Sequence, residues 1–183
     1  GAGLIGTSIG LALAKSGIDV ILQDASPASA ALAVDYGAGR EPKPSDSPAL
    51  IVVCVPPDIT ASVIATELAA FPGAIVTDVA SVKRPVMEWL RANVSALELE
   101  RYVGSHPMAG RERGGAISGR ADLFVGRPWV IAASDLTSSQ AISLVQDLAL
   151  DLEAAVISTT PSNHDRAVAL VSHVPQLVSS LLA

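Results

Sequence analysis

A histidine and a serine in this chain follow predicted strands, where side chains can take part in proton-transfer chemistry. Ser81 and Lys83 come shortly after an apolar run at 74–77, and His106 comes after a short run at 101–104. We expect all strands to be parallel, so these side chains should meet at the edge where the strands end, which is where ligands bind in open α/β sheets. A histidine accepts a proton from a hydroxyl near neutral pH, and the proline that follows it here favours an extended backbone. The pattern predicts His106 as the proton acceptor of a catalytic site.

A glycine-rich segment at the start of the chain has the spacing of a dinucleotide-binding loop. Gly1, Gly3 and Gly6 match the pattern G-x-G-x-x-G, in which glycines allow a tight turn, close approach of a pyrophosphate and close helix–strand packing. The helix predicted directly after the loop offers free N–H groups and a partial positive charge to phosphates. An apolar run at 19–23 leads to Asp24, where a carboxylate accepts hydrogen bonds from ribose hydroxyls and repels a 2′-phosphate. We therefore expect NAD, rather than NADP, as the cofactor.

The end of a second predicted strand should contact the same cofactor. The run at 50–55 is apolar, as in strands that are covered on both faces, and two prolines stop it. Backbone groups at this end should face the dinucleotide. The predicted cofactor-binding residues are Gly1, Gly3, Leu4, Ile5, Gly6, Asp24, Val55, Pro56 and Ser81.

Short apolar runs alternate with amphipathic stretches along the chain, which indicates strands alternating with helices. The predicted strands span 19–23, 50–55, 74–77, 101–104, 129–132 and 154–158. The predicted helices span 4–15, 59–70, 83–91 and 138–150, with a further helix opened by Ser26-Pro27 and a last one from 162 to the end. This alternation is typical of an α/β fold of the Rossmann type, a doubly wound and mainly parallel sheet with helices on both faces.

The last predicted helix differs from the others because its apolar residues cover more than one narrow stripe, so it should be buried on several sides. We expect residues 1–160 to form an NAD-binding Rossmann domain whose first strand precedes Gly1. Residues 161–183 should then begin a truncated all-α domain that serves substrate binding and dimerisation.

Composition narrows the classes of partner. The net charge is −6 and no basic run occurs, which argues against a nucleic-acid partner. No apolar run is long enough to span a bilayer and no signal-peptide pattern opens the chain, so we expect a cytoplasmic protein without a membrane partner. Cys54 is the single cysteine and lies among apolar residues, which is typical of a small buried hydrophobe rather than a metal ligand. Trp89 and Trp129 are predicted core residues.

Four short motifs together resemble the prephenate/arogenate dehydrogenase family of tyrosine biosynthesis. In chain order they are Asp78-x-x-Ser81-x-Lys83, Gly104-Ser-His-Pro-Met-Ala-Gly110 with Glu112, His164-Asp165, and Ser172-His173-x-Pro175. The resemblance spans the whole chain. Two positions depart from it: Arg111 stands where many members carry Thr, and Gln176 stands where many carry His.

The resemblance implies an NAD-dependent oxidative decarboxylation of prephenate to 4-hydroxyphenylpyruvate. It implies that His106 hydrogen-bonds the 4-hydroxyl of the substrate and accepts its proton, while hydride leaves C4 for the nicotinamide and the ring carboxylate is lost. It implies that Ser81 contacts the hydroxyl, His106 or the nicotinamide, that Glu112 lies at the mouth of the site, and that Ser172 and His173 lie on the wall made by the helical domain. The family also implies a homodimer formed through that domain.

Other readings stay open at this point. Arogenate differs from prephenate only in its side chain, so an arogenate dehydrogenase fits the same motifs. A 3-hydroxyacid dehydrogenase has a similar architecture, but it relies on a catalytic lysine from its helical domain. A non-catalytic nucleotide-sensing domain would keep the glycines and Asp24 without needing His106. Arg111 or Arg113 either binds a carboxylate or is a solvated charge, and His164-Asp165 either belongs to the site or caps the last helix.

Overall fold

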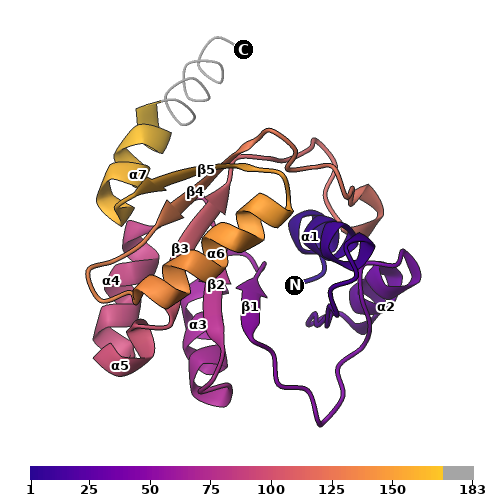
Figure 1. Cartoon of the computed structure of the whole chain (residues 1–183), viewed down its shortest axis with the longest axis horizontal. Helices are drawn as coiled ribbons and strands as arrows, with labels where there is room; N and C mark the ends of the chain where they lie inside the picture. The colour runs from indigo at the N-terminus through magenta and orange to yellow at the C-terminus, as the bar shows by residue number, and fades with distance from the viewer. Residues whose placement is uncertain (171–183) are drawn as a thin grey trace.

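Five strands form one sheet in the computed structural model, which describes residues 1–170 (Figure 1). They are β1 (Leu50–Val53), β2 (Ile75–Asp78), β3 (Tyr102–Pro107), β4 (Pro128–Ala132) and β5 (Ala155–Thr159), and they lie in the order β1-β2-β3-β4-β5. The pairs β1–β2, β2–β3 and β4–β5 are parallel, whereas β3–β4 is antiparallel. The sheet is mainly parallel as predicted, but the expectation that all strands are parallel is wrong at β3–β4. The β3–β4 connection carries only the 3₁₀ turn η1 (Ala116–Ser118), and parallel pairing usually needs a crossover helix.

The helices confirm the predicted alternation. They are α1 (Leu4–Lys15), α2 (Pro27–Asp35), α3 (Pro57–Ala70), α4 (Arg84–Asn93), α5 (Ala96–Leu99), α6 (Ser139–Asp151) and α7 (Pro161–Val168). The short α5, which begins with a capping box between Ser95 and Glu98, and the turn η1 were not predicted. Among residues 1–170, no helix is both long and apolar enough to cross a membrane.

Helices cover both faces of the sheet and create two cores. On one face, Val103 and Trp129 pack with apolar residues of α1 and α6, and full burial of Trp129 confirms its predicted core position. On the other face, Val76 and Tyr102 pack with residues of α3, α4 and α5. Because side chains alternate along a strand, His106 points to the same face as Tyr102, toward α4 and α7.

Two local predictions are wrong, one about a strand and one about a core residue. The segment 19–23 forms only an isolated bridge, Ile21↔Arg40, rather than a strand. Arg40 hydrogen-bonds to the carboxylates of Asp19 and Asp46, so ion pairs hold this segment where a ladder was expected. Trp89 is 41% exposed, because the buried side of α4 is formed by other residues, among them Leu90.

Strand β3 continues past its predicted end at 104 because β4 pairs with its second half. Gly104 to Pro107 face Ala132 to Trp129 in antiparallel register, a partnership that the local sequence does not encode. His106 therefore lies within a strand rather than in the loop after it, and its backbone is paired with Val130 of β4.

Candidate active site

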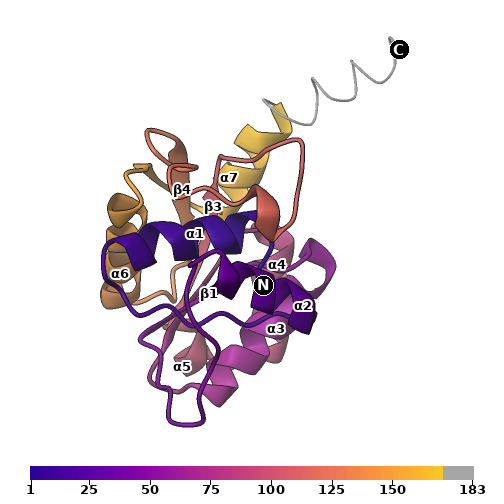
Figure 2. The same cartoon turned by 90° about the vertical axis from the view of Figure 1, so that its right-hand side faces the viewer.

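The glycine loop packs tightly against the end of β1, and two of its glycines are required by that packing. A Cβ on Gly1 would lie 2.0 Å from the carbonyl oxygen of Cys54, and a Cβ on Gly6 would lie 2.0 Å from the carbonyl oxygen of Gly1. Both contacts are far inside van der Waals distance, so no other residue fits there. Figure 2 shows the start of the chain beside β1.

Gly3 has a different environment from the other two glycines. A Cβ at Gly3 would meet no protein atom within 4 Å, so packing within the chain does not require glycine at this position. Gly3 is also the N-cap of α1 and has no side chain to cap the helix, which leaves the N–H groups of the first turn for a ligand. Both features fit the approach of a pyrophosphate to the backbone.

Asp24 fixes the far side of this loop. One carboxylate oxygen accepts a hydrogen bond from the N–H of Ala2 at 2.7 Å, and the other accepts one from the N–H of Ser26 at 2.8 Å. Burial acts to raise the pKa of Asp24, but these backbone donors outweigh it and hold the pKa below its ordinary value. The result is a carboxylate held against the glycine loop by backbone donors, and its role as a ribose acceptor stays a prediction.

The turn after β1 lies next to the same loop. Val55 would be 3.5 Å from a Cβ on Gly1, and the Thr60 hydroxyl donates to the Pro56 carbonyl at 2.9 Å. Burial raises the pKa of the Cys54 thiol to about 12, so Cys54 stays protonated and unreactive. Val55 therefore lies beside the glycine loop, and a contact of Val55 and Pro56 with the cofactor stays a prediction.

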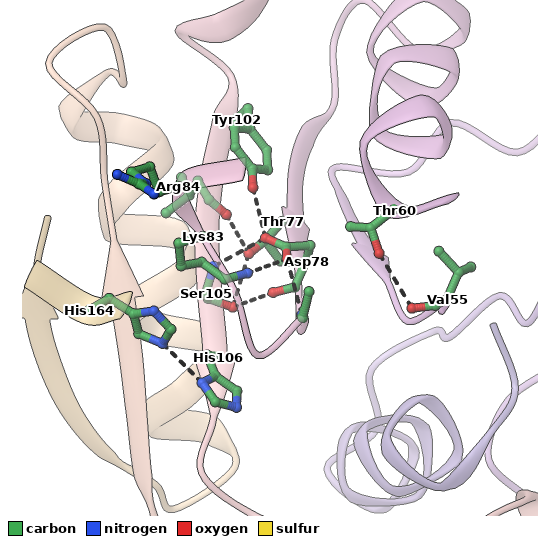
Figure 3. Close-up of polar contacts among 12 residues, drawn as sticks. Val55, Thr60, Thr77, Asp78, Lys83, Arg84, Tyr102, Ser105, His106 and His164 are labelled. Atoms are coloured by element: carbon green, nitrogen blue, oxygen red, sulfur yellow. Dashed lines mark hydrogen bonds and ion pairs between the residues drawn. The ribbon is translucent and has the colours of Figure 1, made fainter. Parts of the chain in front are cut away.

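A buried carboxylate organises the ends of β2 and β3 (Figure 3). Asp78, which is fully buried, forms an ion pair with the ammonium of Lys83 and accepts a 2.8 Å hydrogen bond from the Tyr102 hydroxyl. The Ser105 hydroxyl donates to the backbone carbonyl of Asp78 at 2.7 Å. Burial lowers the pKa of Lys83, while the adjacent Asp78 carboxylate opposes that shift. This cluster locks the two strand ends that carry Ser81 and His106.

His106 contacts a second histidine from α7. Its Nδ1 lies 3.0 Å from Nε2 of His164, whose Nδ1 lies 2.7 Å from Oδ1 of Asp165. In Figure 3 the second ring nitrogen of His106 points away from His164. Burial, followed by the proximity of His164 and Lys83, lowers the pKa of His106 to about 4. The ring is therefore neutral near pH 7, which is the form that a proton acceptor needs.

The other predicted substrate residues are not drawn into these contacts. Ser81 and Glu112 are exposed, and the hydrogen-bond partner of His106 among the described residues is His164 rather than Ser81. Ser172 and His173 lie outside the described residues. Arg111 donates to the Ser118 carbonyl at 3.2 Å.

The sequence alone does not decide whether His164 and Asp165 belong to the site or cap the last helix. The structure places the pair against the histidine expected to do the chemistry, across 58 residues of sequence. In the sequence, only the adjacent His-Asp pair points to a functional role. The spacing of residues along the chain does not reveal that this pair meets His106. Within residues 1–170, no group of three or more His, Cys, Asp and Glu residues is arranged to hold a metal ion.

The fold and the site together define a nucleotide-binding α/β domain of the Rossmann type. Residues 9–158 match the family model described as the nucleotide-binding domain of prephenate dehydrogenase. The chain belongs to this family.

Individual relatives agree with the family match. The chain is 39% identical over 183 residues to "Probable prephenate dehydrogenase NovF" of Streptomyces niveus, covering 100% of this chain and 50% of that protein. The crystal structure of Synechocystis arogenate dehydrogenase matches with a TM-score of 0.87 and 29% identity over 100% of this chain and 66% of that one. Prephenate dehydrogenase from Aquifex aeolicus, in complex with hydroxyphenyl propionate and NAD⁺, matches with a TM-score of 0.89 and 27% identity over 100% of this chain and 65% of that one.

Two curated relatives named prephenate dehydrogenase match this chain along all of its length, and the chain spans about half the length of each. Solved 3-hydroxyacyl-CoA and 3-hydroxybutyryl-CoA dehydrogenases match at only 14–19% identity, which is a likeness of fold alone.

Proposed function

We propose that the protein containing this chain is an NAD-dependent prephenate dehydrogenase, which converts prephenate to 4-hydroxyphenylpyruvate with loss of CO₂. The observation that carries this proposal is the neutral His106 ring, anchored through one nitrogen to His164 at the end of β3. Arogenate dehydrogenase is the second candidate, since the Synechocystis arogenate enzyme matches this fold about as well as the Aquifex prephenate enzyme.

The glycine loop is the part of the chain that would hold NAD. Gly1 and Gly6 set the shape of the loop, Gly3 leaves its backbone approachable, and the uncapped start of α1 supplies N–H donors. Asp24 is a carboxylate whose remaining lone pairs suit ribose hydroxyls and whose charge disfavours a 2′-phosphate. Leu4, Ile5, Val55 and Pro56 complete the proposed cofactor contacts, with Ser81 near the nicotinamide.

The role of the protein in the reaction is proton removal. Bound NAD would supply the hydride acceptor. His106 would take the proton from the substrate 4-hydroxyl as the C4–H bond breaks and the ring carboxylate leaves as CO₂, and would then return that proton to the phenolate oxygen of the product. A base that is neutral at working pH and held within hydrogen-bond reach contributes about 10²–10⁴ in rate. We assign Ser81 to the same hydroxyl or to the nicotinamide, Glu112 to the mouth of the site, and Ser172 and His173 to the substrate wall.

The proposed organisation of the whole protein follows from the same reading. Residues 1–160 form the NAD-binding domain, and residues 161–183 begin a helical domain that completes the substrate site and forms a homodimer. The enzyme works in the cytoplasm on a small-molecule substrate.

The test is a steady-state comparison on the full-length protein, with prephenate and arogenate each paired with NAD and NADP. The proposal expects the highest kcat/KM for prephenate with NAD, and a higher value for arogenate would favour the second candidate. His106→Asn should reduce kcat by about 10²–10⁴ with NAD affinity unchanged. Turnover of neither substrate, or an unchanged kcat in the variant, would refute the assignment.

A further inference from the structure

We propose that His164 and Asp165 are positioning residues that fix the tautomer of His106, so that Nε2 of His106 is the atom that accepts the proton. This inference rests on the proposed function for its kinetic consequence, whereas the tautomer itself is a property of the protein without substrate. Hydrogen bonds link Asp165 to His164 on α7 and His164 to His106 on β3. Figure 3 shows the contact between the two histidine rings.

The polarity of these hydrogen bonds is set at Asp165. Its carboxylate accepts the backbone N–H of Lys83 and that of Arg84, each at 2.9 Å, at the start of α4. Burial acts to raise the pKa of Asp165, but the His164 hydrogen bond and these backbone donors hold it below its ordinary value. An ionised carboxylate only accepts hydrogen bonds, so Nδ1 of His164 must carry the hydrogen in its 2.7 Å contact with Oδ1.

The tautomer of His164 determines the tautomer of His106. In a neutral imidazole, a protonated Nδ1 leaves Nε2 as an acceptor. The 3.0 Å contact between Nε2 of His164 and Nδ1 of His106 is therefore donated by His106. With its hydrogen on Nδ1, His106 presents a lone pair at Nε2, the nitrogen that points away from His164 in Figure 3.

The alternative polarity would need a charged His164 ring that donates at both nitrogens. His164 is only 2% exposed, and burial of an ion disfavours the charged form unless it is well compensated. The charged groups around the two rings are Lys83, whose ammonium repels a further cation, and Asp78 and Asp165, which attract one. Lys83 and Asp78 compensate each other, which leaves Asp165 as the partner that fixes the tautomers.

The same hydrogen bonds from Asp165 through His164 to His106 also act during proton transfer. When Nε2 of His106 takes the substrate proton, the ring becomes a cation that still donates from Nδ1 to His164. The negative charge of Asp165 then stabilises that cation across the His164 ring. The His164 hydrogen bond and the backbone N–H groups at the start of α4 hold the pKa of Asp165 below its ordinary value, so Asp165 does not take the proton itself. This is the logic by which a buried carboxylate orients a catalytic histidine, extended here by one imidazole.

Tautomers can be read directly in the full-length protein by ¹⁵N NMR after labelling histidine ring nitrogens, with the His106 signals assigned by their loss in His106→Asn. We expect the unbound wild-type protein to carry the hydrogen of His106 on Nδ1. In His164→Phe, which removes the acceptor, and in Asp165→Asn, which removes the charge, the hydrogen should redistribute toward Nε2. The exposed neighbour variant Arg166→Gln is the matched control and should leave the tautomer unchanged.

The kinetic expectation is a loss in kcat of about 10²-fold for His164→Phe, since a misdirected base forfeits its alignment, with the Kd for NAD unchanged. If the pair were merely structural, thermal stability would fall while the His106 hydrogen stayed on Nδ1, and that result overturns the proposal. A wild-type ring protonated on Nε2 also overturns it, even if the variants fail to fold. Absence of turnover with both substrates would refute the proposed function but leave the tautomer result to stand by itself.

Discussion

Replacing Gly6 with alanine should damage the fold and the cofactor site together. The new Cβ would lie 2.0 Å from the Gly1 carbonyl oxygen, so the two groups must separate by roughly 1.4 Å to restore an ordinary contact of 3.4 Å. The Gly1 backbone cannot readily retreat, because it already abuts the Cys54 carbonyl at the end of β1. Overpacking of this kind costs about 1–3 kcal/mol, and each kcal/mol lowers Tm by about 2–4 °C in a domain of this size. We therefore expect Tm to fall by roughly 2–12 °C and the Kd for NAD to rise at least about tenfold.

Gly3→Ala separates ligand approach from packing. A Cβ at this position meets no protein atom within 4 Å, and the backbone, with φ −77° and ψ −163°, accepts alanine. Tm should stay within about 2 °C of wild type, because a substitution without contacts changes stability by about 0.5 kcal/mol or less. The Kd for NAD should still rise about tenfold or more, since the methyl group would occupy the approach of the pyrophosphate.

Thermal denaturation and fluorescence titration with NAD on the full-length protein measure both effects. Gly73→Ala, at an exposed position where a Cβ also meets nothing within 4 Å, should change neither quantity. Wild-type affinity in Gly3→Ala would show that the dinucleotide does not cross this loop. Wild-type Tm in Gly6→Ala would show that the close approach of Gly6 to Gly1 is not a constraint on the fold.

Three further predictions concern charged and titratable groups. Asp24→Ser should weaken NAD and reduce the discrimination against NADP, measured as the ratio of the two kcat/KM values; an unmoved ratio would contradict the ribose assignment. Lys83→Met should lower the free energy of unfolding by about 3–5 kcal/mol, because it leaves the buried Asp78 carboxylate unpaired, whereas Arg84→Met at the exposed neighbour should cost about 0.5 kcal/mol or less in urea denaturation. Burial lowers the pKa of His106 from 6.5 to about 4, so between these pH values the unfolded chain binds a proton on His106 and the folded chain does not. The free energy of unfolding should therefore fall as pH drops from about 6.5 to 4. The fall should be smaller than about 3 kcal/mol, because the ring is partly exposed, and a His106→Asn variant with the same pH slope would contradict this.

Local features of the chain were readable because their physical causes are local. The glycine loop and the start of α1 follow from a spacing that only glycine satisfies, and Ser26 before Pro27 marks the start of α2 through the N-cap hydrogen bond that its side chain accepts. The apolar runs that became β1, β2, β4 and β5 were recognised with ends shifted by a few residues. The segment 19–23 has the same apolar character but forms only one bridge, because a strand needs a partner as well as a suitable sequence.

The sequence by itself determined the order of helices and strands, the glycine loop with Asp24 beside it, and the histidine expected to do chemistry. These three features depend on residue types and on short spacings, which set the local backbone conformation and the hydrogen bonds that each residue can make. Only the tertiary structure decided that β4 runs antiparallel to β3, that Asp78 pairs with Lys83 and Tyr102, and that His164 and Asp165 stand behind His106. Those relations join residues far apart in the chain, and the packing of whole elements, rather than any local preference, brings them within hydrogen-bond distance.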